Sequence, residues 1–197
     1  MWVEMNKSLI GKNISDINAD LEIERAIKFL VYKIDESGHN PKPVILHSIR
    51  VERYLESHNY SKNILIAAVL HDILEDTDTS IETIQRSFGK EIAALVEANT
   101  FDKMISDETE KYRDCFNRCF KKGRDALVIK AADILDNSRY YHLSKDRKLN
   151  NFLLQKMKYF IDLSKPLLRN EPIYSELKKQ YRQLVKLFFN RDFNKSF

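Results

Sequence analysis

Glycine and proline are scarce in this sequence. Its 197 residues include only 4 Gly and 4 Pro, which argues against a turn-rich all-β fold and against low-complexity linkers. No stretch approaches the ~20 apolar residues of a membrane span, and residues 1–11 lack an apolar core of signal-peptide length. We therefore expect a cytoplasmic protein that makes no contact with a membrane.

Cysteine and net charge are low as well. The two cysteines, Cys115 and Cys119, lie four residues apart in a predicted helix, where reduced and half-buried thiols are expected in a cytosolic protein. Lys and Arg number 33 against 29 Asp and Glu, a net charge of +4, and the excess basic residues are scattered or near the C-terminus. The sequence therefore predicts no nucleic-acid partner, and the charge suits an anionic small molecule as well as it suits any polymer.

Apolar residues recur with helical spacing along nearly the whole chain, and we find no strand pattern and no internal repeat. Residues 64–70 are all apolar, so a predicted helix over 62–74 is expected at the centre of the fold. Two further helices are predicted near 148–163 and 174–189, with Pro166 between them. The sequence predicts an all-α single domain, long enough to fold without a disulfide or a metal.

Ionisable residues follow the central apolar run directly. His71 and Asp72 come immediately after it, and Glu75 and Asp76 lie four residues after each, so in one continuous helix two columns of polar groups point the same way. A buried carboxylate must be neutralised, paired or bound to a cation. On this segment alone, a metal site and an acidic helix end that reaches solvent both stay open.

Two other positions offer matching ligands. His47 lies within a predicted helix, where a lone histidine is more often an ordinary core residue, and Asp133 follows the apolar stretch 128–132. Together with His71 and Asp72 they form a set of two imidazoles and two carboxylates. Such a set suits one divalent ion, such as Mn²⁺, Fe²⁺ or Zn²⁺, and leaves open positions for water and substrate.

The pattern H…HD…D, formed by His47, His71-Asp72 and Asp133, resembles the signature of the HD superfamily of metal-dependent phosphohydrolases. Longer segments resemble the hydrolase domain of the RelA/SpoT alarmone enzymes and their small single-domain relatives: HDILEDT at 71–77, FGKEIAALV at 88–96 and KAADILDN at 130–137. The similarity covers roughly residues 22–165. It implies an HD-domain helical bundle over 21–165, with an N-terminal extension at 1–20 and a C-terminal helix at 166–197 that packs on the same domain.

The resemblance also implies an activity and roles for individual residues. The implied reaction is hydrolysis of the 3′-pyrophosphate of (p)ppGpp, usually with Mn²⁺, to GDP or GTP and pyrophosphate. The implied metal ligands are His47, His71, Asp72 and Asp133. Glu75 and Asp76 match the pair that acts on the attacking water and the leaving group. The implied nucleotide contacts are Asn137, Lys103 and Tyr159, and candidates to offset the remaining phosphate charge are Lys103, Lys130 and Arg139.

The sequence departs from this family just before the first ligand. Relatives carry an Arg-Lys pair and a Gly-x-Pro-Tyr run there, whereas here Gly38 or a neighbour takes the Arg position and Val44 takes the Tyr position. Lys42 and His39 are the candidate replacements as phosphate or ring contacts. The departure leaves the metal ligands intact and predicts weak recognition of the nucleobase.

Other functions stay open at this point. No histidine occurs between His71 and His142, which argues against a two-metal HD phosphodiesterase. An HD-type hydrolase of another nucleotide (a nucleoside monophosphate, a dNTP or NADPH) fits the same ligands, and so does a non-catalytic nucleotide sensor, although the Glu75-Asp76 pair argues against a sensor. The sequence ends at Phe197, so we expect a hydrolase without a synthetase domain. It makes no prediction of oligomeric state.

Overall fold

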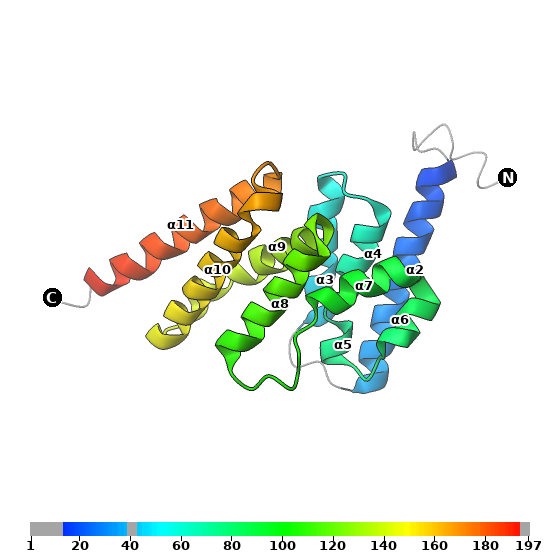
Figure 1. Cartoon of the computed structure of the whole chain (residues 1–197), viewed down its shortest axis with the longest axis horizontal. Coiled ribbons are helices and arrows are strands. Elements are labelled where there is room, and N and C mark those ends of the chain that lie inside the picture. The colour runs from blue at the N-terminus through cyan, green and yellow to red at the C-terminus, as the bar shows by residue number, and fades with distance from the viewer. Residues whose placement is uncertain (1–13, 39–42, 194–197) are drawn as a thin grey trace.

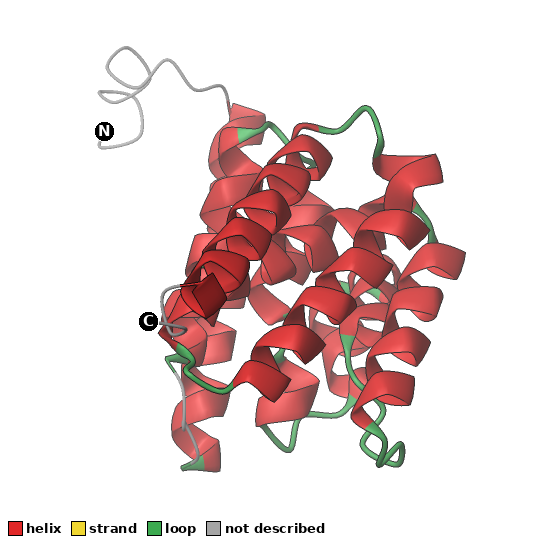
Figure 2. Ribbon diagram, turned by 90° about the vertical axis from the view of Figure 1, so that its left-hand side faces the viewer, coloured by secondary structure: helices red, strands yellow, loops and turns green. Residues whose placement is uncertain are grey.

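The computed structural model describes residues 14–38 and 43–193, and every regular element within these ranges is a helix (Figures 1 and 2). The all-α prediction is therefore confirmed. The elements are α2 (Ile14–Ser37), α3 (Val44–Ser57), α4 (Lys62–Leu70), α5 (Ile73–Asp76), α6 (Ile81–Phe88), α7 (Lys90–Asn99), α8 (Glu108–Lys122), α9 (Arg124–Ser138), the 3₁₀ helix η1 (Tyr141–Leu143), α10 (Arg147–Leu168) and α11 (Pro172–Phe193). Residues 1–13 of the predicted N-terminal extension lie outside the described ranges.

Helix α4 is the centre of the bundle, as the sequence predicts. Its residues from Ile64 to Leu70 are all buried, and it packs against α2, α3, α7 and α9. A helix that is apolar on every side is stable only when other helices cover it completely. Helices α3 and α9 both pack against α4, and they also pack against each other.

The prediction of one helix over 62–74 is wrong, because the chain turns at His71 and Asp72. The Nδ1–H of His71 donates to the carbonyl oxygen of Ala68 at 2.7 Å, the acceptor that a continuous helix would offer to the backbone N–H of Asp72. The carbonyl of Asp72 then accepts the backbone N–H groups of Glu75 and Asp76, each at 3.0 Å, and so begins the short helix α5. The His-Asp doublet consequently lies at a joint between two helices.

The C-terminal part also differs from the sequence prediction. Pro166 lies inside α10, which continues to Leu168, rather than between two helices. Asp162 and Pro166 are both exposed, so the backbone carbonyl of Asp162, which loses its usual donor at a proline, faces water. Helix α11 then packs against α9 and α10, and the hydroxyl of Tyr174 donates to the carbonyl of Ile161 at 3.3 Å.

The two cysteines are free and buried completely, more deeply than predicted. The thiol of Cys119 donates to the carbonyl of Ala98 at 3.1 Å, and the thiol of Cys115 donates to the carbonyl of Asn99 at 3.4 Å. Both side chains therefore fasten α8 to the end of α7. No helix in the described ranges combines the length and the apolar character that crossing a membrane requires.

Candidate metal centre

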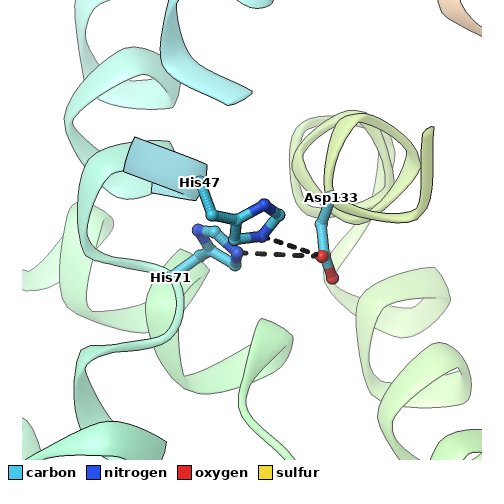
Figure 3. A group of neighbouring side chains, drawn as sticks. All are labelled: His47, His71 and Asp133. Carbon is cyan, nitrogen blue, oxygen red and sulfur yellow. Dashed lines mark ion pairs between the residues drawn. The ribbon is translucent and has the colours of Figure 1, made fainter. Parts of the chain in front are cut away.

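Three helices bring His47, His71 and Asp133 to one buried point (Figure 3). His47 comes from α3, His71 from the end of α4 and Asp133 from α9. One ligand atom of each residue lies within 4.8 Å of the others. The Nε2 atoms of His47 and His71 lie 3.3 and 3.9 Å from Oδ1 of Asp133. Residues up to 86 positions apart in the sequence thus converge on one position.

Asp72, the fourth predicted ligand, lies beside the same point. Its Oδ1 is 3.3 Å from Nε2 of His71, and its Oδ2 is 3.9 Å from Nε2 of His47. The side chain is buried. Both members of the doublet therefore face the same point from the joint between α4 and α5.

In its neutral form, each imidazole has the tautomer that a metal ligand needs. The Nδ1–H of His71 donates to the Ala68 carbonyl, and Nδ1 of His47 lies 2.8 Å from Oδ2 of Asp136. Each ring therefore directs Nε2 inward. Both Nε2 atoms are buried, and neither has a hydrogen-bond partner among the residues that the structure describes. Buried polar atoms are normally satisfied, so two such atoms aimed at a carboxylate fit the donor set of a divalent cation.

Asp136 is a functional candidate that the sequence analysis missed. Its carboxylate accepts from His47 and is also held by Arg50, whose Nε and Nη2 lie 2.9 Å from Oδ1 and 2.7 Å from Oδ2. Burial alone would raise the pKa of Asp136, but His47 and Arg50 outweigh it and lower the pKa to about 2. The available signal was a second carboxylate only three residues after Asp133, within the same apolar helix.

The charge of Asp133 is fixed by its neighbours. Nζ of Lys130 donates to Oδ2 at 3.0 Å, and the side-chain amide of Asn137 donates to Oδ1 at 2.5 Å. Burial favours the neutral acid, yet Lys130 foremost, together with the two imidazoles, holds the pKa of Asp133 well below its usual range. Lys130 is itself buried. Asn137, predicted as a nucleotide contact, thus touches the candidate metal ligand.

Two carboxylates act on the pKa of His47. Burial by itself would lower this pKa, but the neighbouring carboxylates of Asp133 and Asp136 raise it to about 9. A cation that binds here must therefore displace a proton from the ring at neutral pH.

Glu75 and Asp76 lie on α5, within one turn of the doublet. Oε1 of Glu75 accepts the backbone N–H of Phe101 at 2.8 Å, which ties α5 to the loop 100–107. Burial raises the pKa of Glu75 to about 7, and the negative charge of Asp72 adds to this, against the opposing effect of Lys130. A carboxyl group with a pKa near neutrality can both accept and donate a proton at physiological pH.

The other residues predicted to contact the nucleotide lie on several different elements. Lys103 is exposed on the loop 100–107. The ring of Tyr159 packs against Tyr112 and Phe116, with ring centroids 5.8 and 6.4 Å away, and lines a cavity of about 490 Å³ between α8, α10 and α11. Arg139 is exposed at the end of α9, and its Nη1 lies 3.7 Å from Oδ1 of Asp136. Lys42 and His39 lie outside the described residues.

Known proteins share both the sequence pattern and the fold. Residues 26–165 match the model of the HD domain family. A guanosine-3′,5′-bis(diphosphate) 3′-pyrophosphohydrolase of Aquifex aeolicus is 32% identical over 147 residues, which cover 73% of this chain and 21% of that protein. An enzyme of the same name from Drosophila melanogaster is 37% identical over 99 residues, 49% of this chain and 55% of that protein. The chain thus spans about a fifth and about half of these two relatives.

Two solved structures resemble the fold of this chain. A metazoan ortholog of SpoT that hydrolyses ppGpp superimposes with a TM-score of 0.71 at 26% identity, over 82% of this chain and 94% of that one. A Listeria monocytogenes protein, lmo0812, shares the fold with a TM-score of 0.62 at 21% identity, over 70% of this chain and 94% of that one.

Proposed function

The chain belongs to the HD-domain family, and from this premise we propose that it is a metal-dependent phosphohydrolase that converts ppGpp to GDP and pyrophosphate. The observation that carries the hydrolase proposal is a pair of buried imidazole Nε2 atoms that face Asp133 and have no hydrogen-bond partner in the described part of the chain. The choice of ppGpp rests on the activity named for the relatives from Aquifex and Drosophila. We also propose that residues 21–165 carry the activity and that the protein acts in the cytoplasm on a small nucleotide, without nucleic acid.

The proposed ligands of one divalent ion are His47, His71, Asp72 and Asp133. Two imidazole nitrogens with two carboxylates suit Mn²⁺, which we propose as the ion, and also Fe²⁺ and Zn²⁺. When bound, such an ion supplies Lewis-acid chemistry: it lowers the pKa of a water and offsets charge on phosphoryl oxygens. Asp136 and the Ala68 carbonyl hold the two rings in the orientation that this requires.

Glu75 and Asp76 are the proposed acid–base pair. Water adds to the phosphorus next to the ribose 3′ oxygen and the bond from that phosphorus to the 3′ oxygen breaks, which gives pyrophosphate and GDP with a free 3′ hydroxyl. Glu75, with its pKa near 7, takes the proton of the attacking water. Asp76 assists protonation of the departing 3′ oxygen. Asn137, Lys103, Tyr159 and Lys42 remain the proposed nucleotide contacts.

The test is a substrate panel with purified protein and Mn²⁺. It contains ppGpp, pppGpp, NADPH, GTP, dNTPs and nucleoside monophosphates, with products identified by chromatography. We expect ppGpp to yield GDP and pyrophosphate, and we expect Asp72→Ala to abolish this while Asp162→Asn, at an exposed position on α10, does not. Cleavage of a different nucleotide only would keep the hydrolase and refute ppGpp as its substrate. Binding without any cleavage would show a sensor instead.

A further inference from the structure

Lys156 brings a second ammonium group from α10 to the ring of Phe101. Its Nζ lies 4.9 Å from the ring centroid of Phe101, and Nζ of Lys130 lies 5.1 Å from the same centroid. The backbone N–H of Phe101 is the donor to Glu75. Phe101 thus contacts Lys156 and Lys130 through its ring, and it contacts Glu75 through its backbone.

The two lysines differ in their anionic partners. Lys130 forms an ion pair with Asp133 at 3.0 Å. In residues 14–38 and 43–193, by contrast, no carboxylate oxygen forms an ion pair with Lys156, although its side chain is half-buried. Burial lowers the pKa of Lys156, while the more distant charges of Asp133 and Glu75 only partly oppose this. A desolvated ammonium without an anion is costly, and a ring contact offsets only part of that cost.

A bound cation would offset negative charge at the centre. A divalent ion would balance the charges of Asp72 and Asp133, and the ammonium groups of Lys130 and Lys156 would then add further positive charge nearby. An oligophosphate is the class of ligand that both the ion and the lysines attract.

We propose that the ammonium of Lys156 binds a phosphate group of the substrate beside the metal ligands. This inference rests on the proposed function in taking the substrate to be phosphorylated. It assigns the pyrophosphate end of the nucleotide, rather than its base, to the space between α10 and the loop 100–107. Other lysines of α10 do not share these features: Lys158 pairs with Asp162 in an exposed ion pair, and Lys165 is exposed.

The experiment compares Lys156→Met, Lys156→Arg and the control Lys165→Met. Methionine keeps the length and fits a half-buried position, and arginine keeps the charge. The readouts are the affinity for inorganic pyrophosphate by calorimetry, in metal-free protein and with one equivalent of Mn²⁺, the affinity for Mn²⁺ alone, and KM and kcat for ppGpp. Unfolding temperatures of all variants establish that each one folds.

We expect Lys156→Met to weaken pyrophosphate binding and to raise KM by about 10- to 100-fold, the usual effect of losing one charge-assisted hydrogen bond. Mn²⁺ affinity should stay unchanged, Lys156→Arg should recover most of the loss, and Lys165→Met should behave as the parent. Equal pyrophosphate affinity and equal KM in Lys156→Met and the parent, or no pyrophosphate binding by the parent, would overturn the inference. A parent that binds pyrophosphate through Lys156 but leaves ppGpp intact would refute only the proposed function.

Discussion

Asp136 shows how one carboxylate orients a neighbouring ring. It holds Nδ1 of His47 while Arg50 fixes its own two oxygens. We expect Asp136→Asn to lower Mn²⁺ affinity by about 10- to 100-fold, the usual effect of losing such an outer partner of a ligand, with His71 and Asp133 still in place. Calorimetric titration with Mn²⁺ measures this. Asp162→Asn, on the exposed surface of α10, is the matched control, and equal affinity in both variants would rule out the positioning role.

Substitutions of Glu75 and Asp76 should reduce turnover without removing the metal. Glu75→Gln and Asp76→Asn keep side-chain size, and a glutamine oxygen can still accept the N–H of Phe101. We therefore expect both variants to retain Mn²⁺ while turnover falls ~100-fold or more, as for the loss of a positioned acid–base group. Steady-state kinetics and metal analysis on the same samples test this. Parental turnover in both variants would make the pair an ordinary acidic helix end.

The positions before the first ligand should govern base preference. Glycine has no side chain and valine has a short aliphatic one, so neither Gly38 nor Val44 offers a ring or a guanidinium plane to a nucleobase, and Val44 is also fully buried. Stacking on such groups contributes ~1–3 kcal/mol per base. We expect kcat/KM for ppGpp and ppApp to differ by less than about 100-fold at one Mn²⁺ concentration. A larger preference for guanine would mean that other residues, such as Tyr159 or His39, form the base pocket.

At the scale of elements, α3 carries a buried acid outside the metal centre. Glu52 is 3% exposed, and burial foremost, then Glu56, raises its pKa from 4.5 to about 7. Because the folded-state pKa lies above the unfolded one, the folded state binds the extra proton, and stability falls as pH rises from about 4.5 through 7. We expect Glu52→Gln to lose less stability than the parent between pH 5 and pH 8, measured by urea unfolding.

The exposed pair on α2 supplies the control for that experiment. Glu24 pairs with Lys28 and its side chain is 55% exposed, so Glu24→Gln should keep the parent's dependence on pH. If the stability of Glu52→Gln changed with pH as the stability of the parent does, burial would not raise the pKa of Glu52 as proposed.

The helices were predictable where apolar spacing alone determines them. The central position of α4 followed from seven consecutive apolar residues. The turn at His71 was not predictable, because it depends on a side chain that takes a backbone acceptor. The continuation of α10 through Pro166 depends on the exposure of that face, which local sequence does not show.

The proposed metal ligands of the site were predictable from the sequence, but the residues around them were not. The convergence of His47, His71 and Asp133 could be expected because the family pattern carries it. The roles of Asp136 and Lys156 depend on which helix faces which: α9 lies against α3, and α10 lies against α9. The spacing of Asp136 after Asp133 marks it as a second carboxylate of that helix, but it does not identify His47 and Arg50 as its partners.

At the scale of the whole molecule, the proposed ion would connect helices that are far apart in the sequence. α3, α4 and α9 each contribute at least one ligand, so binding should stabilise the folded state as a unit. At a free Mn²⁺ concentration of about 100 times the dissociation constant, the gain is about 2.7 kcal/mol. For a chain of this size it corresponds to an increase in Tm of roughly 5–10 °C. Calorimetric unfolding with Mn²⁺ and with EDTA measures it, and Asp72→Ala should remove most of the increase.

The joint at His71 and Asp72 has an evolutionary consequence. The proposed ligands lie on α3, on α9 and at the joint after α4, whereas the carboxylate of Glu75 accepts the backbone N–H of Phe101 in the loop 100–107. A lineage can therefore change that loop, and with it the setting of the proposed acid–base group, while it inherits the proposed metal ligands unaltered. Descendants of one ancestral scaffold could in this way diverge in substrate and still bind the same ion.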